Sequence, residues 1–281
     1  MGPYALVARA CLGIYLALAA FLVFFYLRMI LPFVALPADI LMWGENGFVA
    51  ATLRLRLGEP LYGPPGDSNS MIYSPLAPLF TYGISRLLGS PDSLAVLRGI
   101  QLGFVTMAAL AGTHCWWLLR RLAYPDHELA FRKTWRVLVF LILFLAGVSD
   151  RVNSFTFCLH PDALALLVSM LGFWSALRYL HAPGPARLLC MALVPAAALV
   201  TKQLLLSWFA VLLVCVLLHR LAASPWRPAL HAGAGFAAAA ALILAGALGV
   251  CAWVWGSNFL FWVFQVLGGQ SAEAGLRRGA Y

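Results

Sequence analysis

Charged side chains are scarce in this chain. Asp, Glu, Lys and Arg together make up 10% of its 281 residues, against roughly a quarter in soluble globular domains. Hydrophobic residues make up 63% of the sequence, and its mean hydropathy is +0.88. Several windows reach the roughly 20 apolar residues that are needed to cross a bilayer. This composition excludes an ordinary soluble domain and predicts an all-α fold, a polytopic bundle of transmembrane helices.

Paired cysteines and internal repeats are also missing. The six cysteines lie far apart, so no spacing typical of a disulfide framework or a zinc site arises. The lack of repeats disfavours a transporter built from two similar halves. The net charge of +9 would suggest a nucleic-acid partner in a soluble protein, but here the basic residues fall in loops and report membrane orientation. We therefore expect membrane lipid, and no nucleic acid, as a partner.

Seven apolar segments predict about seven spans in a single transmembrane domain, the first within residues 1–36 and six more within 92–256. The first segment lacks a small-residue cleavage site and exceeds a signal-peptide core, so we interpret it as an uncleaved span. The predicted segments are Ala10–Ile30, Val96–Leu118, Val137–Val148, Ala163–Leu180, Leu188–Leu199, Leu204–Leu218 and Ala232–Val254.

The segment Pro75–Gly89 is too short for a comfortable span, and Arg86 interrupts it. We expect a helix lying flat in the membrane interface. With a cytoplasmic N-terminus, this placement puts the basic loops inside the cell and most carboxylates outside, as the positive-inside rule requires. An eight-span alternative with an external N-terminus keeps the later loops correct and is opposed by charge only weakly. The expected location is a cell membrane, which the chain crosses several times.

Residues 37–91 form the expected external acidic loop. Trp43–Leu57 has helical character and ends at Gly58 and Pro60, which suit a helix C-terminus. Two interfacial helices, joined by a polar loop at 62–70, would hold Asp39 and Glu45 at the water–lipid boundary. A carboxylate there can act as a general base. The alternative is that both are solvated acids, favoured near a helix start by the macrodipole.

Other polar residues are predicted on the same side of the membrane. His160 and Asp162 begin the fourth span, and Lys202 separates the fifth from the sixth. A lysine between apolar segments is costly at membrane depth and suggests a function, here as the counter-ion of an anionic lipid phosphate. The alternatives are a snorkelling Lys202, a local ion pair of Arg151 with Asp150, and an ordinary helix start at His160.

The order of several short motifs resembles the GT-C superfamily of polytopic glycosyltransferases, the fold class of protein O-mannosyltransferases and lipid A aminoarabinose transferase. The resemblance covers roughly positions 10 to 265. It is closest to the bacterial members, which implies the bacterial inner membrane as the location. After one span come the acidic loop with WGENG at 43–47, then RLGEPLY at 56–62 and IYSPL at 72–76. A basic loop, HPDALAL at 160–166 and TKQ at 201–203 follow.

The resemblance implies an enzyme that transfers sugar with inversion, from a polyprenyl-phosphate donor to a glycan, lipid or protein of the cell envelope. It implies that Glu45, with Asp39 as second candidate, is the catalytic base. Asp162 and Lys202 match positions of the family's motifs, whereas His160 stands where an arginine is expected. With Arg151, these residues form the expected substrate-binding set. Similar enzymes need no metal, although two loop carboxylates could bind Mg²⁺ or Mn²⁺.

The end of the chain departs from the family pattern. Family members continue with further spans, whereas residues 257–281 are expected to begin an external loop, so the chain is expected to be truncated. An inactive or partial glycosyltransferase-like protein is therefore an alternative function. A transporter of lipid-linked sugars is another, although the ionisable residues gather at the predicted outer boundary and not in the middle of the spans.

Overall fold

The computed structural model describes residues 3–36, 43–67, 70–90, 93–123, 132–149, 158–223 and 225–266. Every regular element in these ranges is a helix, so the all-α prediction is confirmed for this part of the chain. The elements are α1 (Pro3–Val34), α2 (Trp43–Leu57), α3 (Leu76–Leu87), α4 (Leu94–Ala123), α5 (Arg132–Val148), α6 (Asp162–His181), α7 (Pro185–Thr201), η1 (Gln203–Leu206), α8 (Ser207–Ala223), α9 (Trp226–Leu260) and η2 (Phe261–Val266).

Each of the seven apolar segments falls within helical structure. The first lies in α1, and the other six lie in α4 to α9. Among the described residues, four helices are long and apolar enough to cross a membrane. These are Val7–Val34, Leu94–Leu122, Asp162–His181 and Trp226–Val266. The apolar helices α7 and α8 are shorter, and α5 has 17 residues.

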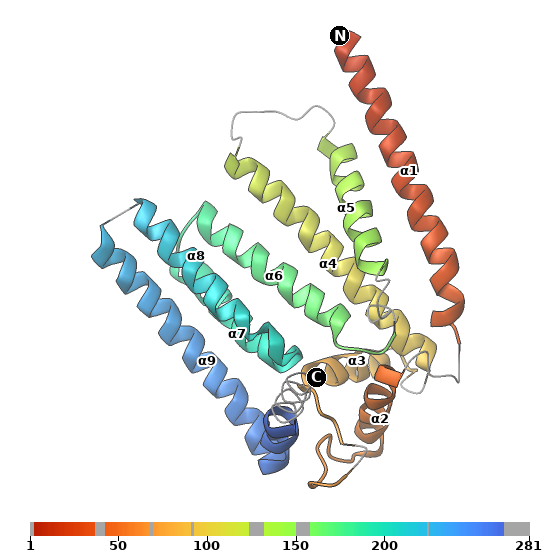
Figure 1. Cartoon of the computed structure of the whole chain (residues 1–281), viewed down its shortest axis with the longest axis vertical. Coiled ribbons are helices and arrows are strands. Elements are labelled where there is room, and N and C mark those ends of the chain that lie inside the picture. The colour runs from red at the N-terminus through yellow and green to blue at the C-terminus, as the bar shows by residue number, and fades with distance from the viewer. Residues whose placement is uncertain are drawn as a thin grey trace, which may run out of the picture.

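The long helices run side by side, and α4 lies near the middle of the bundle between α5 and α6 (Figure 1). On one side, α1 packs chiefly on α5, and on the other side α9 covers α7 and α8. The helices α2 and α3 do not follow this direction. They gather at the lower end of the bundle in Figure 1, where α1 ends and α4 and α6 begin.

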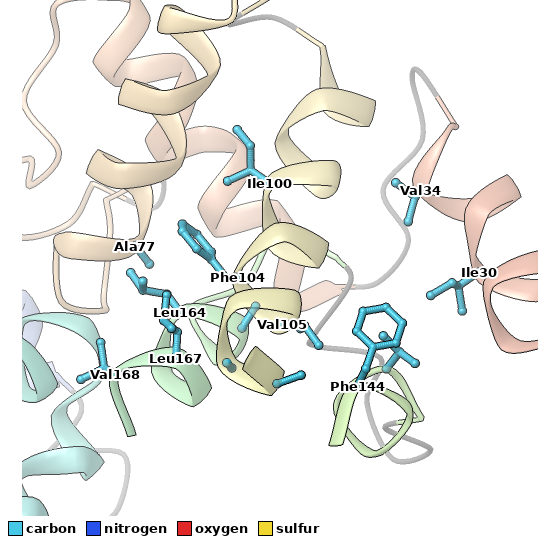
Figure 2. Packing of buried hydrophobic residues seen from close by; sticks show 14 of the residues in the cluster. Ile30, Val34, Ala77, Ile100, Phe104, Val105, Phe144, Leu164, Leu167 and Val168 are labelled. Carbon is cyan, nitrogen blue, oxygen red and sulfur yellow. The ribbon is translucent and has the colours of Figure 1, made fainter. Parts of the chain in front are cut away.

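The largest apolar core lies where α1, α3, α4, α5 and α6 meet (Figure 2). Phe104 and Val105 of α4 lie at its centre, with Phe144 of α5 and Leu164 of α6 around them. The Val105 side chain packs closely against the backbone of α5 at Gly147, where an added Cβ atom would lie only 2.7 Å from Cγ1 of Val105. This core fixes the ends of α4, α5 and α6 relative to α3.

The chain does not become irregular immediately after the predicted last span. Gly256 breaks α9 with φ 63° and ψ −152°, a backbone conformation that is essentially limited to glycine. Residues 257–266, expected to begin a loop, are helical on both sides of the junction with η2. The break therefore turns the chain while helical structure continues.

The break brings the end of α9 into contact with residues 58–75, the segment between α2 and α3 that contains the polar loop. The Trp262 side chain donates a hydrogen bond from Nε1 to the Gly63 carbonyl at 2.8 Å. The ring of Tyr62 packs edge-on against Trp255 and Phe259, at 5.5 and 5.4 Å between centroids. Burial raises the pKa of the Tyr62 hydroxyl well above its usual value, so this group is neutral and donates to the Tyr73 carbonyl at 2.7 Å.

Candidate functional site

Three of the predicted site residues meet at the start of α6. Asp162, the first residue of α6, accepts a hydrogen bond at Oδ1 from Nζ of Lys202, which follows the last residue of α7. The Nδ1 atom of His160 lies 3.1 Å from the other carboxylate oxygen, Oδ2. The side chains of Asp162 and Lys202 retain 22% and 24% exposure, whereas that of His160 is 5% exposed. The pair of opposite charges is therefore accessible, and the imidazole contacts its carboxylate from the buried side.

A cavity of about 690 Å³ begins at this ion pair and continues between the helices. Its lining on α6 runs from Asp162 to Met170, which corresponds to about 12 Å along the helix axis. The remaining lining comes from α4, α5 and the connection from α7 to α8, and most of it is apolar. The lining residues are Ala108, Ala109, Leu143, Ala146, Gly147, Asp162, Ala165, Leu166, Ser169, Met170, Lys202 and Leu205. The cavity is thus charged at one end and apolar along its length.

Aromatic side chains of the acidic loop cover the buried side of the ion pair. Phe48 of α2 lies 5.0 Å from the His160 ring, and Tyr73 lies 5.9 Å from it, both edge-on. Burial, together with the nearby charge of Asp162, raises the pKa of the Tyr73 hydroxyl. Tyr73 therefore stays neutral at physiological pH and adds no charge to this part of the site.

The residue next to Tyr73 ties the same loop to α7. Ser74 is buried and donates a hydrogen bond from Oγ to the carbonyl of Leu199 at 2.7 Å. Leu199 lies in the last turn of α7, three residues before Lys202. The Ser74 hydroxyl therefore ties the acidic loop to the helix that immediately precedes Lys202.

The carboxylate of Glu45 is not exposed at a water–lipid boundary, and that expectation is wrong, because the side chain is fully buried inside the protein. Arg98 of α4, also fully buried, donates from Nε to Oε1 at 2.8 Å and from Nη2 to Oε2 at 2.7 Å. The backbone N–H of Leu159 donates to Oε1 at 2.8 Å. Such a bidentate, charge-assisted pair holds both groups in a fixed geometry.

Arg98 extends this contact to the end of α1. Its Nη1 donates to the carbonyls of Leu36 at 2.8 Å and Phe33 at 3.3 Å. The Glu45–Arg98 pair thus joins α1, α2 and α4 to Leu159, the residue before His160. Sequence reasoning missed Arg98, although a signal was present: an arginine inside an apolar segment of membrane-spanning length needs a partner.

The polar loop between α2 and α3 has its own ion pair. Arg54 of α2 contacts the carboxylate of Asp67 and also donates to the carbonyl of Pro60 at 3.0 Å. Ser70 accepts at Oγ from the Gly63 backbone N–H at 3.0 Å. Asp67 therefore acts in shaping the loop, and Glu59 is its exposed carboxylate.

Two predicted site residues, Asp39 and Arg151, lie outside the described residues. Within the described ranges, no group of three or more His, Cys, Asp and Glu side chains is placed to hold a metal ion. The nearby thiol of Cys158 is buried, which raises its pKa to about 12 and keeps it protonated. The chemistry of the described site therefore rests on one ammonium, one carboxylate and one imidazole.

The fold and the site together define a helical protein with apolar helices of membrane-spanning length and a mostly apolar cavity that ends at an ion pair. Comparisons with protein-family models, with curated proteins and with solved structures find no match for this chain.

Proposed function

We propose that this protein is a membrane glycosyltransferase that moves a sugar from a polyprenyl-phosphate donor to an acceptor at the outer face of the membrane. The observation that supports this proposal best is the apolar cavity that ends at Lys202 and Asp162. A polyprenyl phosphate has the same distribution of properties, a long apolar chain with an anionic head. The cavity volume also lies within the range of about 300–1,000 Å³ that is typical of ligand sites.

The proposed topology has seven spans and a cytoplasmic N-terminus. The helices α1 and α4 to α9 alternate in direction through the bundle, and α2 and α3 lie together at one end of it (Figure 1). In this topology α2 and α3 lie on the external surface of the membrane that the bundle crosses. The basic ends of α4, α6 and α8 then face the cytoplasm, in agreement with the positive-inside rule.

Lys202 is assigned to the donor phosphate. Its ammonium lies at the polar end of the cavity and is held there by Asp162, so it needs little reorganisation to meet an anion. Charge-assisted hydrogen bonds of this kind stabilise the phosphate as it leaves the sugar. Arg151 is assigned as a second cation for the same group, and His160 and Asp162 orient the lysine.

The base is assigned to Asp39 and not to Glu45. A general base must come within hydrogen-bonding distance of the proton that it removes. Glu45 is fully buried and accepts hydrogen bonds from Arg98 and Leu159. It is therefore a positioning residue, which fixes α2 and the segment before α6.

The reaction is a single displacement. The acceptor oxygen attacks C1 of the sugar from the face opposite the phosphate, while Asp39 takes the acceptor proton. The bond from C1 to the phosphate oxygen breaks, and the polyprenyl phosphate leaves with the electron pair, facing Lys202. The new glycosidic bond has the inverted configuration, and no other reactant is consumed.

The test is transfer of labelled sugar from a polyprenyl-phosphate donor in membranes that contain the full-length protein. Removal of general base catalysis in Asp39→Asn should lower the rate roughly 100-fold or more, whereas Lys202→Ala should mainly raise the KM for the donor. The matched control is Glu59→Gln, which changes the exposed loop carboxylate and should leave transfer intact. If the wild-type protein transfers no sugar from any such donor, the proposed activity is wrong. A fully active Asp39→Asn variant would remove only the assignment of the base.

A further inference from the structure

A second cluster of chemistry-bearing residues lies at the end of the bundle away from α2 and α3. Two arginines from different helices lie over one tryptophan ring of α4: the guanidinium carbon of Arg136 is 4.1 Å from the Trp117 centroid, and that of Arg121 is 5.1 Å from it. On α6, Arg178 lies 5.5 Å from the Trp174 ring. The His114 ring is 6.4 Å from Trp174 and within electrostatic reach of both Arg136 and Arg178. We call these four basic residues and two tryptophans the Arg–Trp cluster.

The tryptophan rings lie on the inner side of the guanidinium groups, and the guanidinium groups are exposed. Trp117 is only 8% exposed, whereas the side chains of Arg121, Arg136 and Arg178 are exposed. A guanidinium within about 6 Å of a tryptophan centroid is attracted to the ring face. Because these guanidinium groups are exposed, their N–H donors can bind an anion while the contact with the tryptophan is kept.

Among the described residues, charge is one-sided at this end of the molecule; Asp126 and Glu128, in the connection from α4 to α5, lie outside them. The described carboxylates are Glu45, Glu59, Asp67 and Asp162, and all four belong to the acidic loop or to the start of α6. In the described part of the chain, the helix ends on the same side of the bundle as the Arg–Trp cluster instead carry further cations. These are Arg120, Lys133, Arg187, Arg220 and Arg227. Cations brought together in this way repel one another, and an anion at their centre relieves the repulsion.

We propose that the Arg–Trp cluster binds the phosphodiester headgroup of an anionic membrane phospholipid. A phosphodiester carries one negative charge and two unesterified oxygens, which match the paired N–H groups of arginine. Tryptophan is typical of the headgroup level of a bilayer, and basic residues at that level attract anionic lipids. This site does not depend on the proposed transferase activity.

The surroundings favour a lipid over a soluble phosphate. The last two turns of α4 also expose Leu119 and Leu122, and Trp135 of α5 is 36% exposed. A headgroup at the Arg–Trp cluster thus has apolar helix surface beside it, along which acyl chains can lie. A soluble anion would use the arginines and leave this apolar surface uncovered.

The experiment uses the full-length protein in nanodiscs of phosphatidylcholine that contain a minor fraction of phosphatidylglycerol. Native mass spectrometry of the released protein counts each bound lipid. We expect the wild-type protein to retain phosphatidylglycerol in preference to phosphatidylcholine. The variant with Arg121→Gln, Arg136→Gln and Arg178→Gln should lose affinity on the order of 100-fold, from about 1 kcal/mol for each basic residue.

A control with the same loss of charge separates a site from a general surface effect. It carries Arg120→Gln, Lys133→Gln and Arg227→Gln, three cations of the same end that lie outside the cluster, and should keep most of the affinity. Equal losses in the two variants, or no preference of the wild-type protein for phosphatidylglycerol, would overturn the proposal. Competition by soluble glycerophosphate at equal concentration would also overturn it, since the ligand would then not be a lipid.

Folding is checked separately, so that a failed variant remains informative. The melting temperature of each variant in neutral nanodiscs should stay near that of the wild-type protein. If the triple glutamine variant does not fold, the triple lysine variant serves in its place, since it keeps the charge but removes the planar fork. It should lose part of the preference for phosphatidylglycerol, and full retention would contradict the proposed arginine geometry.

Discussion

Arg98 and Glu45 show how one residue pair holds the candidate site together. The protein buries both side chains completely, away from water and from lipid. Burying a charge without a partner costs several kcal/mol, whereas a well-bonded pair recovers most of this cost. The pair is therefore more important for the arrangement of α1, α2, α4 and Leu159 than for net stability.

This reasoning predicts a marked difference between single and double variants. Arg98→Met removes the guanidinium from a buried carboxylate and should destabilise the protein by about 3–5 kcal/mol. Adding Glu45→Leu removes the remaining charge, so the double variant should be more stable than Arg98→Met alone. Thermal unfolding of the purified proteins in detergent measures both.

The control for this comparison is Arg56→Met, an exposed arginine of the same helix as Glu45. It should change the stability by less than about 1 kcal/mol, as is typical of surface charges. Losses that simply add in the double variant would show that the two residues act independently, in contradiction to the observed geometry.

The candidate site is predictable only in part from its residues. Asp162 and Lys202 stand out because they interrupt apolar segments at helix ends, and the alternating direction of the helices places such ends together. The partner of Glu45 does not stand out, because Arg98 lies 53 positions away and no periodicity links the two. Pairing across helices depends on which helix faces are in contact, and this information is not local.

At the scale of elements, the helices of the acidic loop end where its glycine and proline residues predict. The helix expected at Trp43–Leu57 has these same limits, and Gly58 adopts the positive φ of 73° that suits a helix end. The helix expected within Pro75–Gly89 is α3, with Gly89 at φ 71° behind it. Glycine and proline signals are local, which explains why these limits could be predicted.

The end of α9 was less predictable, and Gly256 is the reason. An apolar segment does not reveal where a helix changes direction when aromatic residues continue on both sides of the break. Here the break allows Trp262 to bind the Gly63 carbonyl. The fold thus uses α9 both as a helix of the bundle and as a cover for the acidic loop.

Gly256→Ala should destabilise the protein, because a Cβ atom strains this backbone conformation by about 1–3 kcal/mol. It should also raise the susceptibility of the loop at 58–70 to limited proteolysis, since the contact of Trp262 is weakened. Urea or thermal unfolding and the rate of loop cleavage are the measurements.

Gly246→Ala is the matched control, because Gly246 lies in the regular part of α9 and a Cβ atom added there would meet no other atom within 4 Å. Alanine there should be neutral or stabilising by roughly 0.5–1 kcal/mol. Equal behaviour of the two variants would mean that the break at Gly256 does not matter for stability.

At the scale of the whole molecule, apolar surface dominates the outside of the bundle. Only 11% of the most apolar window of α1 is buried, and the same share is buried in α9. Both helices expose large side chains, such as Phe21 and Phe24 of α1 and Trp253 of α9. A surface of this size and composition requires an apolar environment, which agrees with the membrane interpretation of the sequence.

The proposed topology predicts which end of the bundle is outside. In a variant without its native cysteines, Glu59→Cys places a thiol on the exposed part of the acidic loop, and Ala222→Cys places one at the exposed end of α8. In intact cells a membrane-impermeant maleimide should label only the first. After permeabilisation it should label both. Labelling of neither cysteine in intact cells would support the eight-span alternative, in which the acidic loop is cytoplasmic and the later loops keep their sides. Labelling of Ala222→Cys alone would contradict both topologies.

The buried pair of Glu45 and Arg98 has a consequence for how the chain is made. Synthesis proceeds from the N-terminus, so the carboxylate on α2 exists before the arginine on α4 emerges. When α4 is inserted beside α1, its arginine can therefore meet a partner that is already in place. The order of the two charges along the chain thus lets the bundle assemble without a stage in which Arg98 must wait in lipid for its counter-ion.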